Sequence, residues 1–153
     1  MIRSEPEYQE ALRRLDQDKR VAAQQRDALG KAALSTEEVE RGMQPLLSFH
    51  AQLEEEIDWY EKVRRREFPI IRRLTQLGQL LIALRIANGI TQHELADRLG
   101  VSESVVSRDE RNEYHGVSVE RAQRILSVLN GRVTVELETP CPAEEDEDLL
   151  AVS

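Results

Sequence analysis

The stretch from Thr91 to Arg111 constrains the fold most, because it carries the start and end signals of two consecutive short helices. Thr91 is a favourable N-cap residue, and Glu94, three residues later, completes the pattern of a capping box. Gly100 stands where a helix commonly ends in a residue of positive φ. Ser102 then provides the N-cap of a second helix. The stretch therefore predicts two short helices joined by a tight turn.

The apolar residues of these two helices are spaced so that they face one core. Leu95, Ala96 and Leu99 share a face of the first helix, and Val106 points inward from the second. The outward positions of the second helix hold small polar or charged residues: Ser102, Glu103, Ser104, Ser107 and Arg108. Such a helix suits the DNA major groove, which accepts one α-helix and is recognised through hydrogen bonds. We therefore predict a helix-turn-helix.

The run T-Q-x-E-L-A-x-R-L-G-V-S-x-S-x-V-S-R-x-E resembles the lambda-repressor/Cro (XRE) family of DNA-binding domains. The resemblance continues upstream through Leu80–Ile90, which is similar to the family's first helix. Downstream, Val117–Asn130 is similar to the helix that closes the family's bundle. The resemblance covers roughly residues 70–130, under half of the chain, and implies a small helical bundle that binds DNA.

The resemblance also implies roles for single residues. Gln92 matches a position that contacts a DNA phosphate at a helix N-terminus. Arg108 is the best candidate for pairing with guanine, whereas Glu103 either accepts from a cytosine amine or only favours the helix dipole. Arg85 and Glu110 match a pair that bridges the first helix and the recognition helix, so we assign them a structural role. The predicted DNA-binding residues are Gln92, Ser102, Glu103, Ser104, Ser107 and Arg108.

Asp109 departs from the family pattern, which usually places an apolar core residue at this position. A buried carboxylate without a partner is costly. We therefore expect Asp109 to be partly exposed or paired with Arg111 or Arg85. Tyr114 is expected to fill the space that an apolar residue would have occupied.

The charge of the chain is distributed unevenly. The net charge is −8 over 153 residues. Residues 1–68 carry 12 basic and 15 acidic residues, residues 69–139 carry nine of each, and residues 140–153 carry five acidic residues and no basic one. A neutral DNA-binding region predicts modest non-specific affinity, because phosphate neutralisation supplies most of that affinity. A dimer would double the contacts.

Composition argues against a membrane protein and against an enzyme. The single cysteine, Cys141, excludes an intrachain disulfide and fits a reducing cytosol. There is no apolar run of transmembrane length and no signal-peptide pattern, so we expect a soluble cytoplasmic protein. The three histidines lack metal-ligand spacing, and no Gly-rich phosphate loop or nucleophile elbow occurs. We expect no metal, no cofactor and no catalysis.

Residues 1–68 are predicted to form a helical hairpin. Ser4 and Glu7 form a capping box, with Pro6 in the first turn. A second N-cap signal begins at Ser35, but Gly42 and Pro45 interrupt it, so we expect a short helix, a kink and a long helix from about Pro45. The apolar seam of the first helix suits either a dimeric coiled coil or a partner helix within the chain. Its polar interruptions favour the intrachain hairpin.

Three features of this region leave their roles open. His50 lies on the apolar stripe of the second helix and is predicted to be packed rather than a ligand. Trp59 suits either an interface or the core. The arginines 64–66, 72 and 73 bracket Phe68–Pro69 and suit either DNA phosphates or the acidic face of the second helix. The phosphate-contact candidates are Arg72, Arg73 and Arg111.

Residues 132–138 alternate strictly between apolar and polar side chains, which predicts a strand. One strand cannot satisfy its own backbone, so we expect it to pair with the same strand of a second copy. The rival interpretation is that it extends the sheet of a different protein. The dimerisation candidates are Val133, Val135 and Leu137. The acidic segment 140–153 is predicted to be disordered.

Together these features predict a mainly all-α chain with four parts. They are a hairpin (1–68), a lambda-repressor-like bundle (69–131), a dimerisation strand (132–139) and an acidic tail (140–153). The predicted function is repression of transcription by a homodimer on a palindromic operator. Glu7-Tyr8 and Ala11-Leu12, with the helical extension, also resemble HigA-type antitoxins, which bind DNA and neutralise a toxin. A protein-interaction scaffold without DNA binding is the second alternative.

Overall fold

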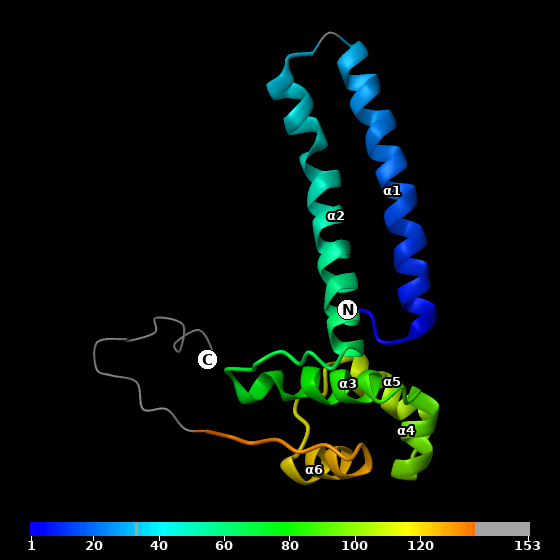
Figure 1. The fold of residues 1–153 in the computed structure, drawn as a ribbon, viewed down its shortest axis with the longest axis vertical. Helices are drawn as coiled ribbons and strands as arrows, with labels where there is room; N and C mark the ends of the chain where they lie inside the picture. The colour runs from blue at the N-terminus through cyan, green and yellow to red at the C-terminus, as the bar shows by residue number, and fades with distance from the viewer. Residues whose placement is uncertain (33, 137–153) are drawn as a thin grey trace, which may run out of the picture.

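The computed structural model describes residues 1–32 and 34–136. This part of the chain is helical, as predicted, with a long two-helix projection joined to a compact bundle (Figure 1). The helices of the projection are α1 (Glu5–Lys31) and α2 (Thr36–Arg64). A short 3-10 helix, η1 (Leu74–Gln76), precedes the bundle helices α3 (Leu77–Ala87), α4 (Gln92–Leu99), α5 (Glu103–Arg111) and α6 (Val119–Val128).

Helices α1 and α2 run antiparallel and side by side, which confirms the predicted pairing within one chain (Figure 1). The Ser4 hydroxyl caps α1 by accepting from the Glu7 amide at 3.4 Å. Ser35 and Glu38 form a complete capping box at the start of α2. His50 is buried in this hairpin, and its Nε2 lacks a hydrogen-bond partner among the described residues. Trp59 is half-buried against the core.

The prediction that the second long helix begins near Pro45 was wrong. Helix α2 begins at Thr36 and continues through Pro45, which lies inside it. Proline removes one backbone hydrogen bond from a helix interior. Here the capping box at Ser35 starts the helix. Met43, two residues before the proline, is buried with only 1% exposure, and His50 after it is buried as well. Burial on both sides of the proline keeps the helix continuous.

The two helices predicted from the capping signals are present. The Thr91 hydroxyl accepts from the Glu94 amide at 3.1 Å, and the Glu94 carboxylate accepts from the Thr91 amide at 2.7 Å. The Thr91 amide and hydroxyl both donate to the Glu94 carboxylate, and these two hydrogen bonds hold the pKa of Glu94 below its usual value. Gly100 ends α4 in the left-handed region, with φ at 70°, and Ser102 occupies the N-cap position of α5.

One hydrophobic core joins the hairpin to the bundle. Ile57 and Val63 of α2 belong to the same cluster as Ile82 of α3, Leu95 of α4 and Ile125 of α6. Ile2, which precedes α1, is also in this cluster and is only 3% exposed. The base of the hairpin is therefore packed into the bundle rather than connected only through the segment around Pro69.

The chain leaves α6 through Asn130, which has a positive φ of 53° and ends the helix as expected. The predicted strand is not formed in the described residues 132–136, which lie in neither a helix nor a strand. A strand needs a neighbouring backbone to pair with, and the described part of this chain supplies none there. Residues 137–139 of that prediction, and the whole predicted tail, lie outside the described residues. Among residues 1–32 and 34–136, no helix has the length and apolar character needed to cross a membrane.

Candidate nucleic-acid interface

Helix α5 has one buried side and one open side. Val106 and Glu110 are each 1% exposed and face the core. On the opposite side lie five of the predicted DNA-binding residues. Ser107 is half-buried, and the other four are exposed: Ser102, Glu103, Ser104 and Arg108. Arg111 at the end of the helix is exposed as well. The helix therefore presents a continuous polar surface, as its sequence pattern predicts.

The first turn of α5 carries two local contacts on this open side. The hydroxyls of Ser102 and Ser104 lie 2.9 Å apart and share a hydrogen bond. Ser102 thus occupies the N-cap position without making the side-chain capping bond that the sequence suggested. The carboxylate of Glu103 lies 3.5 Å from Nδ1 of His93 on α4, a contact that the sequence did not indicate.

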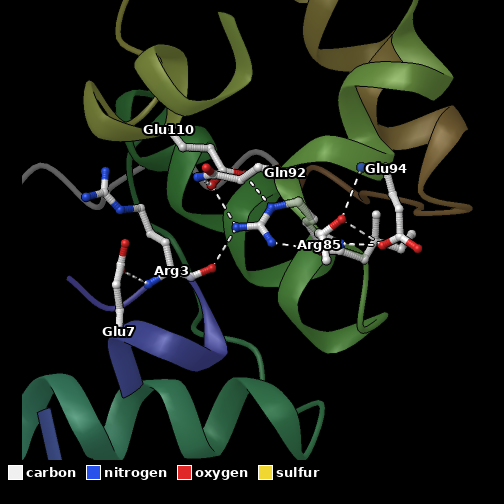
Figure 2. A network of polar contacts seen from close by, with 8 residues as sticks. Arg3, Glu7, Arg85, Gln92, Glu94 and Glu110 are labelled. Carbon is white, nitrogen blue, oxygen red and sulfur yellow. Dashed lines mark hydrogen bonds and ion pairs between the residues drawn. The ribbon is translucent and has the colours of Figure 1, made fainter. Parts of the chain in front are cut away.

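A buried ion pair fixes α5 to the rest of the bundle (Figure 2). Nε of Arg85 on α3 donates to Oε1 of Glu110 at 2.5 Å, and its Nη2 donates to Oε2 at 2.7 Å. Nη1 of Arg85 donates to the carbonyl of Ile90 at 2.8 Å. Arg85 therefore links α3, the loop before α4 and α5. A charged pair this deeply buried is costly to break, because the remaining charge would lose its partner.

Gln92 lies in the first turn of α4 and joins the same network. Its Nε2 donates to Oε2 of Glu110 at 2.7 Å (Figure 2). Gln92 is the first residue of α4, and the N-terminus of a helix favours an anion. The residue predicted to contact phosphate is thus tied to the recognition helix through Glu110.

Asp109 is partly exposed and paired, as expected, but its partner is neither Arg111 nor Arg85. Asp109 is 22% exposed at its side chain, but it pairs with Arg121 of α6 at 2.6 Å. Arg85 is committed to Glu110. Tyr114 is 5% exposed, and its amide donates to the Asp109 carbonyl at 2.7 Å. Burial raises the pKa of Tyr114 well above its usual value.

The arginines between hairpin and bundle have separate surroundings. Arg64 pairs with Glu5 of α1 at 2.9 Å and Arg65 with Glu67 at 2.8 Å, so neither pairs with the acidic run of α2 as one interpretation suggested. Arg72 and Arg73 are exposed, and both backbone amides donate to the side chain of Gln76. They lie before the start of α3 at Leu77, and Arg85 lies further along that helix, about 12 Å from its start.

The helices that carry these contacts match a known protein family. Residues 81–135 match the family model described as helix-turn-helix. This segment is a helix-turn-helix domain of the lambda-repressor-like (XRE) type. The helix-turn-helix domain contains most of α3 and all of α4, α5 and α6, so it includes both the open face of α5 and the Arg85–Glu110 pair. Comparison with curated proteins and with solved structures gave no match.

The family match indicates a general activity for residues 81–135. Domains of this family bind DNA and regulate transcription and are not typically enzymes. The family match begins in α3, so the hairpin and residues 1–3 lie outside it. Sequence patterns gave no indication that residues 1–3 contact the helix-turn-helix domain, because that contact joins positions more than 80 residues apart and leaves no local signal.

Proposed function

We propose that this protein is a sequence-specific transcriptional repressor that binds a palindromic operator as a homodimer through α5. The observation that supports this proposal most strongly is the helix-turn-helix domain itself, with its second helix exposing polar side chains over residues 102–111. Val106 and Glu110 hold the opposite side of that helix in the core. A rigid helix with an open polar face suits recognition in the major groove.

The proposed contacts divide between bases and phosphates. Arg108 pairs with guanine through its guanidinium group, and Glu103 accepts from cytosine. The hydroxyls of Ser102, Ser104 and Ser107 add hydrogen bonds to base edges or adjoining phosphates. The phosphate contacts come from Gln92, Arg72, Arg73 and Arg111.

Dimerisation is proposed to use the segment after α6. Val133 and Val135 are 38% and 63% exposed, in a segment that is neither helix nor strand. Pairing with the same segment of a second chain would satisfy the backbone and cover both valines. Leu137, the third dimerisation candidate, lies outside the described residues. A dimer also offsets the neutral charge of residues 69–139, because two copies double the phosphate contacts.

Selection of bound fragments from the source organism's DNA tests this function. The purified full chain is mixed with fragmented genomic DNA at about 0.1–0.2 M salt, where weak non-specific binding is screened. We expect enrichment of one inverted repeat whose half-sites lie about 10 base pairs, or a multiple of this, apart. Absence of any enriched sequence would contradict the proposal.

An antitoxin is the second candidate, because the hairpin exposes apolar side chains. Val21, Leu34, Leu47 and Phe49 are each about 40% exposed along its length, away from the helix-turn-helix domain. Such residues suit a protein partner. Enrichment of a repeat in front of this gene and a small neighbouring gene, together with a stable complex of the two products, would favour the antitoxin. A chain that binds the neighbour but no DNA would be a scaffold.

A further inference from the structure

The N-terminal residues before α1 are held in place by three kinds of contact. The Met1 ammonium pairs with Glu56 of α2 at 2.9 Å. Ile2 is 3% exposed in the core shared by the hairpin and the helix-turn-helix domain. The Arg3 amide donates to Glu7 at 2.8 Å. Residues 1–3 therefore have a defined position, although no helix includes them.

This position brings Arg3 into the network that fixes the recognition helix (Figure 2). The Arg3 carbonyl accepts from Nη2 of Arg85 at 2.8 Å. The same Nη2 donates to Glu110 at 2.7 Å, and Glu110 accepts from Gln92 at 2.7 Å. Only the Arg85 and Glu110 side chains therefore separate Arg3 from the residue proposed to contact a DNA phosphate.

The guanidinium of Arg3 has no acidic partner among residues 1–32 and 34–136. The hydrogen bonds of this residue all involve its backbone. Its side-chain Nε is buried without a hydrogen-bond acceptor, while the residue as a whole is half-buried. Nearby arginines differ, because Arg64 pairs with Glu5 and Arg85 with Glu110. Arg3 therefore has a backbone that is held in position and a guanidinium without a counter-ion among the described residues, and such a guanidinium can bind an anion.

Resting on the DNA-binding function proposed above, we infer that Arg3 is a further DNA-contacting residue, which binds a backbone phosphate beside the one contacted by Gln92. The DNA-binding surface then extends beyond the helix-turn-helix domain to the start of the hairpin. Figure 2 shows the Arg3 side chain on the side of the network where Glu110 lies. A phosphate contact carries no base information of its own, so Arg3 contributes affinity and orientation rather than sequence preference.

The test compares the full-length chain with Arg3→Ala, Arg3→Lys and Arg26→Ala on a DNA fragment enriched in the genomic selection. Arg26 is the matched control, because it is an exposed arginine of α1 near the far end of the hairpin and removes the same charge. Dissociation constants are measured over a series of salt concentrations. We expect Arg3→Ala to weaken binding about threefold to tenfold. The log of the association constant should also fall less steeply with log salt, with the slope smaller in magnitude by about 1 per subunit. Arg3→Lys should keep most of that slope, and Arg26→Ala should leave it unchanged.

Two results would overturn the inference. One is an Arg3→Ala slope equal to that of the wild type. The other is an equal loss in Arg26→Ala, which would show that only net charge matters. Thermal unfolding of each variant identifies any loss caused by misfolding, and the slope is compared at a temperature where all variants are folded. Failure of the wild type to bind any fragment would instead contradict the proposed function, so the two failures are distinguishable.

Discussion

Glu110 fixes α5 to two other helices through its buried carboxylate. Its carboxylate is 1% exposed and accepts hydrogen bonds from Arg85 and Gln92, on two different helices. Leaving one charge of such a pair buried without its partner typically costs about 3–5 kcal/mol. The Arg85–Glu110 pair was expected only from the resemblance to the lambda-repressor family, because the spacing of apolar and polar residues does not indicate a buried charge at either position. The neighbouring Asp109 pairs with Arg121, a partner that the local sequence did not indicate.

The buried phenol of Tyr114 makes the free energy of unfolding depend on pH in alkaline solution. Burial raises the pKa of its phenol above the usual value of 10.0. The folded chain therefore keeps this proton above pH 10, whereas the unfolded chain loses it, so the contribution of Tyr114 to stability is complete below pH 10 and falls as the pH rises further. Above pH 10 we expect this residue to lower the free energy of unfolding by about 1.4 kcal/mol per pH unit.

Urea unfolding of the wild type and Tyr114→Phe at a series of pH values measures this effect. The free energy of unfolding of Tyr114→Phe should fall less steeply above pH 10 than that of the wild type. The pKa values of Tyr8 and Tyr60 are raised too, by the Glu61 hydrogen bond and by burial respectively, so some slope remains in the variant. Parallel curves for the two proteins would contradict the assignment.

At the scale of elements, local signals specify α4 and α5 well and α2 less well. The capping box at Thr91, the N-cap position at Ser102 and the turn glycine at position 100 lie within a few residues of the helix ends that they mark. Helix α2 differs. Pro45 is a local signal that predicts a break, but burial on both sides of the proline keeps the helix continuous. The predicted strand after α6 differs again, because pairing depends on a backbone that the described chain does not supply.

Gly78 tests the packing between elements, because α3 approaches the loop after α5 closely at this residue. A Cβ at this position would lie 1.8 Å from the Glu113 carbonyl oxygen. Gly78→Ala therefore forces α3 away from that loop, and we expect a loss of about 1–3 kcal/mol in the free energy of unfolding. The gain in helix propensity, about 1 kcal/mol at most, is too small to reverse this.

Gly30→Ala is the matched control for Gly78→Ala. Gly30 lies in α1 and has no atom within 4 Å of its built Cβ. Alanine should therefore leave the hairpin unchanged or stabilise it by up to about 1 kcal/mol. Denaturant unfolding of both variants gives the comparison. Equal effects of the two substitutions would show that the contact between Gly78 and Glu113 is not close.

At the scale of the whole molecule, the hairpin and the helix-turn-helix domain share a core. Pro69 was a reasonable sequence boundary, since it lies between the last residue of α2 and the first of α3. Yet Val63 of α2 is fully buried in the same cluster as Ile82 of α3, and Ile2 joins them. Contacts between residues this distant in sequence leave no periodic pattern. The sequence therefore predicted the helices of each part, but not the packing between the two parts.

Recognition of a DNA sequence by α5 is tested most directly by the binding preference of Arg108→Ala. Affinities of the wild type and this variant are measured for an enriched fragment and for a shuffled fragment of the same length, at one salt concentration. Arg108 is exposed on the open face of α5, so its removal should not disturb the core. Loss of one bidentate base contact should reduce the preference for the enriched fragment by about 1–3 kcal/mol per subunit, or roughly 5- to 150-fold. An unchanged preference in Arg108→Ala would contradict recognition through this helix.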